Sequence, residues 1–153
     1  IAIRLADVEY AEILIDTVGL RYLGCKSNRE RGGLHMDQEL FNPQSSSVTS
    51  SRILYTPSTF ARTSLLHLQE VGSLQSIHQH TSTRTNLTSF LCFVVLSGTG
   101  SLTYEGMTYE LSAGDCVFID CRKAYSHSTS DNLWSLQWCH FYAPFLPAVY
   151  EKY

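Results

Sequence analysis

The sequence predicts an all-β domain of short antiparallel strands, arranged as a sandwich or a barrel. From Ile53 onward, apolar and polar residues alternate with a period of two, which is typical of strands that bury one face. Glycine turns interrupt this alternation at 98–100, 105–106 and 112–115. Strands this short, joined by such turns, indicate antiparallel sheets rather than parallel strands connected by helices.

A helix is expected ahead of the strands, over residues 5–18. Apolar residues share one face of its helical wheel, whereas Glu9, Glu12 and Asp16 lie on the opposite face. Gly19 then supplies a suitable stop. Because the polar face is acidic, we expect this helix to pack on the outside of the domain rather than on a membrane.

A polar stretch without periodicity follows at residues 24–52, and it is expected to be loop or linker. Together with the helix it makes residues 1–52 an N-terminal segment distinct from the strands. A stretch of this length without secondary structure is either flexible or functional.

Eight strands are expected after this segment, within a barrel that spans residues 53–143. They are 63–69, 74–78, 89–97, 100–104, 108–111, 115–119, 125–129 and 134–142. Residues 144–153, PFLPAVYEKY, predict the start of a C-terminal helix.

The composition is that of one folded domain. The chain has 153 residues, of which 44% are hydrophobic and 16% charged. Its net charge is −3 and it has no dense basic stretch, so we do not expect this chain to bind DNA by itself. The longest apolar run, 90–96, is too short to cross a bilayer, and no signal segment opens the sequence.

The five cysteines do not predict a disulfide framework. Their number is odd, no C-x-x-C pair occurs, and Cys92 and Cys116 lie inside apolar, strand-like runs. We expect them to be small buried hydrophobes in a reducing compartment, which predicts a cytoplasmic protein.

The most specific pattern is the run at 97–120, SGTGSLTYEGMTYELSAGDCVFID. A hydrophobic strand ends at a glycine turn, a hairpin follows, and a Gly-Asp turn starts another apolar strand, which resembles the cupin layout. The tail at 120–142, DCRKAYSHSTSDNLWSLQWCHFY, is similar to the sensor domain of AraC/XylS transcription regulators. The resemblance covers residues 53–153. It implies a small antiparallel jelly roll, the cupin double-stranded β-helix.

Cupin enzymes hold a metal through a G-x5-H-x-H motif, and this spacing occurs here at His78 and His80. Arg84, however, lies near the position of the motif's Glu, and Tyr125 occupies that of its later His. Two imidazoles leave a metal short of three protein ligands, and a guanidinium opposes its charge. We therefore predict no metal and no cofactor. His127 remains an alternative third ligand if the register is shifted.

The same residues predict a polar cup inside an apolar barrel. Strand positions two apart share a face, and this gives two inward rows: Leu136, Trp138, His140 and Tyr142, and Tyr125 with His127. Indole, imidazole, phenol and guanidinium groups together suit a sugar, whose apolar face stacks on the indole while its hydroxyls form hydrogen bonds. The predicted ligand-binding residues are Arg84, His80, Tyr125, His127, Trp138 and His140.

The AraC resemblance agrees with this cup, because sugar-sensing members use an Arg, aromatic residues and imidazoles at the positions of Arg84, Tyr125, His127 and Trp138. Each residue also has a purely structural interpretation. Trp138 is equally well a core indole, and Arg84 equally well a surface ion-pair partner.

These observations predict the effector-sensing domain of an AraC-type transcription regulator rather than an enzyme, since the sequence has no nucleophile motif or phosphate loop. A small polar metabolite, most simply a sugar, binds in the barrel, and residues 40–52 form a candidate arm over it. The resemblance implies a homodimer that contacts DNA only through a domain absent from this sequence. The alternatives are a metal-dependent cupin isomerase or dioxygenase, and a dimerisation module whose barrel holds no ligand.

Overall fold

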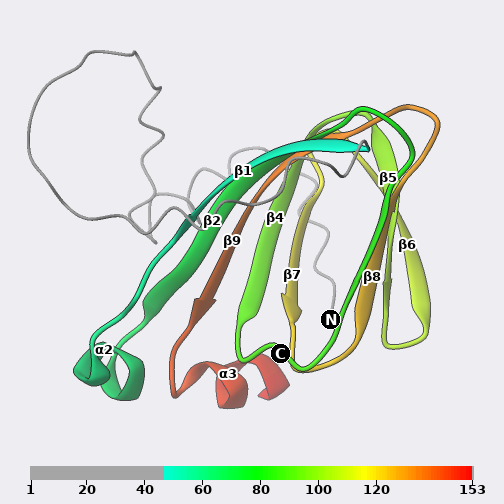
Figure 1. The fold of residues 1–153 in the computed structure, drawn as a ribbon. Coiled ribbons are helices and arrows are strands. Elements are labelled where there is room, and N and C mark those ends of the chain that lie inside the picture. Colours follow the sequence, from blue (N-terminus) through cyan, green and yellow to red (C-terminus); the bar gives the residue numbers. More distant parts are fainter. Residues whose placement is uncertain (1–46, 153) are drawn as a thin grey trace, which may run out of the picture.

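The computed structural model describes residues 47–152, which form two antiparallel sheets that face each other (Figure 1). Sheet A has the strand order β1-β2-β9-β4-β7, and sheet B has the order β3-β8-β5-β6. This confirms the predicted all-β jelly roll. The predicted helix at 5–18, and the part of the linker before residue 47, lie outside the described residues.

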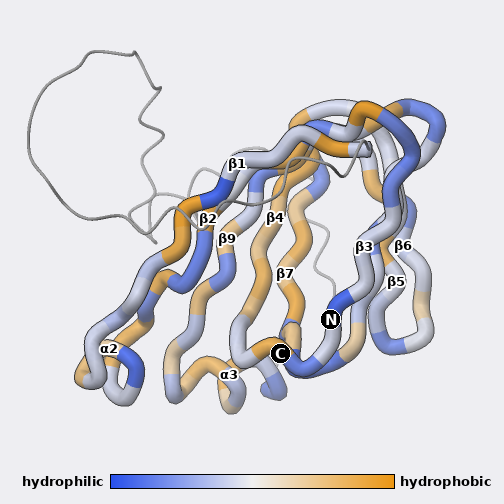
Figure 2. The backbone as a smooth tube through the Cα atoms, viewed as in Figure 1, coloured by the Kyte–Doolittle hydropathy of each residue, from blue (hydrophilic) through white to orange (hydrophobic). Residues whose placement is uncertain are grey.

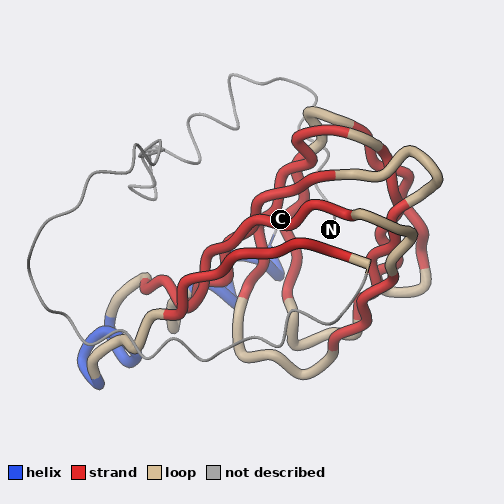
Figure 3. The backbone as a smooth tube through the Cα atoms, turned by 45° about the horizontal axis from the view of Figure 1, so that its top comes forward, coloured by secondary structure: helices blue, strands red, loops and turns tan. Residues whose placement is uncertain are grey.

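Strands make up most of the described chain (Figure 3), and two short helices, α2 and α3, lie at the same end of sheet A (Figure 1). The elements are β1 Val48–Leu54, α2 Thr59–Ser64, β2 His67–Ser76, β3 Thr81–Arg84, β4 Phe90–Ser97, β5 Thr99–Tyr104, β6 Met107–Ser112, β7 Cys116–Asp120, β8 Tyr125–Thr129, β9 Ser135–Tyr142 and α3 Leu146–Lys152.

Two local predictions were wrong at the start of the barrel. Residues 48–52 are not linker but most of β1, an edge strand that pairs only with β2. Most of the side chains of β1 are exposed, so the strand is not marked by apolar alternation. It forms because its residues favour extended backbone and because it pairs with β2. The strand predicted at 63–69 begins only at His67, because Ser58 caps α2 by accepting a hydrogen bond from the Ala61 amide at 3.2 Å. Strand β3 was not predicted.

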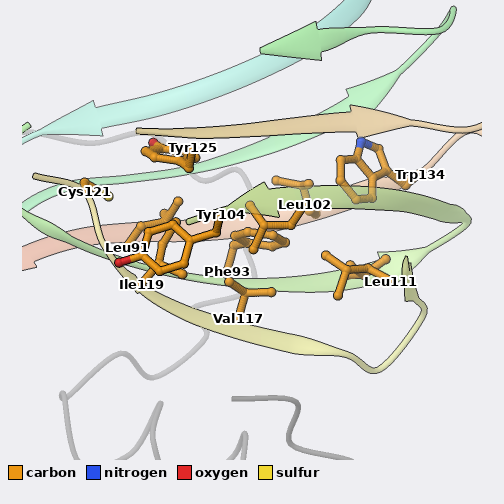
Figure 4. Packing of buried hydrophobic residues seen from close by; sticks show 12 residues of the cluster. Leu91, Phe93, Leu102, Tyr104, Leu111, Val117, Ile119, Cys121, Tyr125 and Trp134 are labelled. Carbon is orange, nitrogen blue, oxygen red and sulfur yellow. The ribbon is translucent and has the colours of Figure 1, made fainter. Parts of the chain in front are cut away.

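The main hydrophobic core lies between the two sheets. In Figure 4, Phe93 and Leu102 lie between Tyr125 at one end of the cluster and Trp134 at the other. Trp134 is fully buried. Hydropathy follows this arrangement, because the neighbouring strands β4 and β7 are the most apolar part of sheet A, whereas the edge strand β3 is hydrophilic (Figure 2).

The opposite face of sheet A carries a second apolar cluster, and α3 packs against it. The ring of Tyr150 lies 5.3 Å from that of Phe90 and 5.4 Å from that of Phe118. Beside them, the buried carboxylate of Asp120 accepts hydrogen bonds from Nε and Nη2 of Arg122. The helix predicted to begin after Pro144 is confirmed.

Four cysteines lie in the described part of the chain, and all four are free thiols. Three are buried, whereas Cys92 is partly exposed, which agrees with the prediction of small buried hydrophobes. Burial is the main cause that raises the pKa of Cys121 to about 11. The Cys92 and Cys116 sulfur atoms lie 3.7 Å apart.

Candidate functional site

Strand β9 carries side chains into the space between the sheets and onto the face covered by α3. Leu136 belongs to the core between the sheets, and the partly exposed Trp138 packs against that core. Cys139 and Phe141 belong instead to the second cluster. Because alternate residues of a strand share a face, His140 lies on the same interior face as Trp138.

Trp138 is held against the backbone of β2. It pairs across the strands with Gly72, where an added Cβ would come within 2.3 Å of Cζ2 of the indole and 2.7 Å of the Ser51 carbonyl oxygen. Only glycine leaves room for a ring this close to the strand. The indole Nε1 also donates a hydrogen bond to Oε1 of Glu70 at 3.2 Å, so the ring is fixed both by packing and by its polar edge.

Glu70 faces the interior because β2 contains a bulge. Leu68 pairs with Phe141 and Glu70 pairs with His140, so the register shifts by one residue between them. Without the bulge, Leu68 and Glu70 would share a face. The Glu70 carboxylate also lies 3.9 Å from Nη1 of Arg52 on β1. The sequence prediction missed both residues, since neither the bulge nor the edge strand leaves a pattern in the sequence.

On sheet B, β8 directs Tyr125 and His127 inward. Tyr125 is buried, which raises the pKa of its hydroxyl. The His127 ring lies 6.2 Å from that of Phe93 on sheet A and 6.5 Å from that of His80. Its Nδ1 is buried and has no hydrogen-bond partner within residues 47–152. A buried polar atom of this kind is rare, and it is satisfied when a ligand or a water supplies the partner.

Arg84 lies opposite Tyr125 at the end of β3, where it is exposed and donates a hydrogen bond to the Thr83 carbonyl at 2.9 Å. The positive charge of Arg84 contributes to lowering the pKa of imidazoles on both sheets. The pKa of His127 is lowered to about 4, first by burial, then by His80, then by Arg84. Burial and then Arg84 lower the pKa of His80 in the same way.

His140, on sheet A, has a lowered pKa through burial and the charge of Arg84, which outweigh the opposing effect of Glu70. Its Nδ1 lies 2.9 Å from Oγ of Ser89, so one ring nitrogen is already occupied. The charge of Glu70 also acts on Tyr125, across the interior. The ring contact between His127 of sheet B and Phe93 of sheet A, which is the strand partner of Trp138, places these side chains in the space between the sheets.

The two histidines of the cupin-like motif are separated by the fold. His78 is exposed ahead of β3, whereas His80 lies beside His127. Within residues 47–152, no three side chains of the His, Cys, Asp or Glu type are placed to share one metal ion. The rings of His80 and His127 are arranged edge to face, with their centroids 6.5 Å apart.

All six predicted ligand-binding residues lie around the interior. Sheet A contributes Trp138 and His140, and sheet B together with its approach contributes His80, Arg84, Tyr125 and His127. A hollow of about 260 Å³ lies over β1, β2, β4 and β9; its lining includes Leu136 of the core but none of these six residues. It is lined by serines, threonine and leucines together with Gln75, so it contributes no titratable group.

The fold is that of known cupin structures. A cupin superfamily protein from Desulfitobacterium hafniense matches with a TM-score of 0.51 and 10% identity, over 76% of this chain and 97% of that chain. The Cupin_2 domain of an XRE family transcriptional regulator from Enterobacter cloacae matches with a TM-score of 0.49 and 14% identity, over 64% and 98%. KdgF from Halomonas sp. matches with a TM-score of 0.47 and 11% identity, over 65% and 84%.

These likenesses concern the fold alone, and the first of them shows the cupin jelly roll predicted from residues 97–120. A scan against protein-family models finds no match, and a search of curated proteins finds none either. Among the described residues, no helix is long and apolar enough to span a membrane.

Proposed function

We propose that this chain is an effector-binding domain, in which a small polar metabolite such as a sugar binds between the two sheets without being chemically changed. The observation that carries this proposal is that both sheets place partly exposed polar side chains beside the apolar core, which together form the polar half of the site. A packed dimerisation module would not need these groups.

The polar half has the chemistry that a sugar requires. The indole of Trp138, fixed over Gly72, supplies an apolar platform for the face of a pyranose ring. Around it, Glu70 offers carboxylate acceptors, His127 offers a free ring nitrogen, and Arg84 offers guanidinium donors. Directional groups of this kind distinguish one arrangement of hydroxyls from another.

The regulatory part of the proposal is that binding changes the arrangement of a DNA-binding domain, as in AraC-type regulators. A ligand achieves this only through unequal affinity for two arrangements, with couplings of about 1–3 kcal/mol. Helix α3 follows β9 directly in the chain, so it is the described element best placed to continue toward such a domain. We further propose a cytoplasmic homodimer, in which only the additional domain contacts DNA.

A second candidate function is favoured by the His80–His127 pair, whose ring centroids lie 6.5 Å apart. With one further ligand, two imidazoles on one face would hold a divalent metal, as in cupin isomerases and dioxygenases. Metal analysis of the purified protein separates the two candidates. A stoichiometric transition metal that is lost in a His80→Ala variant would favour the enzyme.

The effector proposal is tested by a thermal-shift screen of the purified chain against a panel of sugars and sugar derivatives. A compound at 100 times its dissociation constant adds about 2.7 kcal/mol to the free energy of unfolding. Trp138→Ala should abolish the shift, and Phe60→Ala, at an exposed aromatic residue on α2, should retain it. A shift that survives in Trp138→Ala would remove Trp138 from the site, and a panel without any shift would count against the proposal.

A further inference from the structure

We infer that the ligand carries one acidic group, a carboxylate or a phosphate monoester, which is held between Arg84 and the imidazoles of His80 and His127. This inference rests on the proposed function and narrows its ligand from polar metabolites in general to hydroxylated acids.

Glu70 has a positively charged neighbour, whereas Arg84 has no negatively charged one within the described residues. Glu70, on β2, already accepts a hydrogen bond from Trp138 and lies 3.9 Å from Arg52. Arg84 has no carboxylate partner within residues 47–152, and it donates a hydrogen bond to the backbone carbonyl of Thr83. A guanidinium has five donors in a planar fork, and this geometry fits a carboxylate or a phosphate.

The groups next to Arg84 also suit an anion. His127 presents a buried ring nitrogen without a partner, and the ring of His80 lies beside it. An imidazole donates to an anionic oxygen when it takes up a proton, and a nearby anion favours that proton. Within the protein itself the opposite influence prevails, because burial and Arg84 keep the pKa of both histidines low.

The residues proposed for the acidic group and for the sugar ring are connected through neighbouring positions of the two sheets. Trp138 pairs with Phe93, and the Phe93 ring lies 6.2 Å from that of His127 across the sheets. Tyr125 lies two residues before His127 on β8 and pairs with Arg84 on β3. A sugar ring stacked on Trp138 therefore directs a substituent toward His127 and Arg84 on sheet B. On sheet A, the carboxylate of Glu70 repels an acidic group but accepts hydrogen bonds from hydroxyl groups.

The test compares a neutral sugar with its acidic relatives at constant ionic strength. D-glucose, D-glucuronate and D-glucose 6-phosphate, and the second pair D-galactose and D-galacturonate, are titrated against the purified chain by calorimetry, with sodium acetate as a control for simple anions. We expect at least one acid to bind about 10-fold or more tightly than its neutral sugar, as one charge-assisted bidentate contact provides. Preference for a uronate or for the phosphate identifies which acidic group is recognised.

Variants then assign the contact. Arg84→Gln should reduce the affinity for the preferred acid about 10-fold more than it reduces the affinity for the neutral sugar, so that the preference for the acid is lost. Arg62→Gln, at an exposed arginine on α2, serves as the matched control and should change neither. Circular dichroism establishes that both variants are folded.

Other outcomes overturn the inference in distinguishable ways. A neutral sugar that binds as tightly as its acid overturns the inference but leaves the proposed function standing. Equal effects of acetate and uronate would show nonspecific anion binding, and full affinity for the acid in Arg84→Gln would remove the proposed contact; each overturns the inference. Absence of binding by every compound counts against both the inference and the proposed function.

Discussion

The protonation of His127 gives the most quantitative test of the interior described above. Burial, His80 and Arg84 together lower its pKa from 6.5 to about 4. This difference means that a proton binds the folded chain less favourably than the unfolded chain by about 3 kcal/mol. Above about pH 6.5 the residue is neutral in both states and has no effect on stability.

As the pH falls below 6.5, the unfolded chain takes up this proton first, so the folded state loses stability until the pH reaches about 4. The assay is urea unfolding followed by circular dichroism, at several pH values between about 7.5 and about 4. His127→Gln removes the titrating group and should flatten the dependence by about 3 kcal/mol across this range. His78→Gln, at an exposed position, is the matched control.

Parallel loss of stability in the original chain and in His127→Gln would refute this reasoning. It would mean that the imidazole is as well solvated in the folded state as in the unfolded state, and that the interior near β8 is open to water. His80 and His140 also have lowered pKa values and contribute their own acid sensitivity. The comparison therefore uses the difference between variants rather than the total pH dependence.

Three further outcomes are expected from the packing. Gly72→Ala should lower the free energy of unfolding by about 1–3 kcal/mol and shift the tryptophan emission, because the added methyl group displaces Trp138; unchanged emission and stability would contradict the close approach. Asp120→Asn weakens a buried, bidentate contact and should cost about 1–3 kcal/mol in urea unfolding without altering ligand affinity. In a Cys25→Ser background, the four described thiols should react slowly with Ellman's reagent until urea unfolds the chain, and rapid reaction in the folded state would show that they are accessible.

The strands that bury one face were the part of the fold that the sequence could predict. The strand at 125–129 matches β8 in full, and the predicted ends of β4, β5, β6, β7 and β9 lie within one residue of those observed. Their alternation is strong because each strand has the core on one side. The edge strands β1 and β3 escaped prediction, since polar side chains on both faces produce no alternation.

The residues of the candidate site, too, could be predicted only where the alternation of their strands is regular. His127 and Trp138 were placed inward correctly because β8 and β9 are regular over those positions. Glu70 was missed because the β2 bulge breaks the alternation that would have located it, and Arg52 was missed because it lies on an edge strand. Contacts such as that between Trp138 and Glu70 join residues 68 positions apart, and a single sequence holds no information on such pairings.

The position of β9 inside sheet A restricts how this chain can change. The strand has neighbours on both sides, and its residues from 136 to 141 alternate between the interior and the face on which α3 packs. Removing or adding a single residue in β9 would exchange the side chains on its two faces. Cys139 and Phe141 would then point between the sheets, and Trp138 would point toward α3. Length variation is therefore confined to the loops at either end of β9, whereas substitutions within it can alter one face while the other keeps its packing.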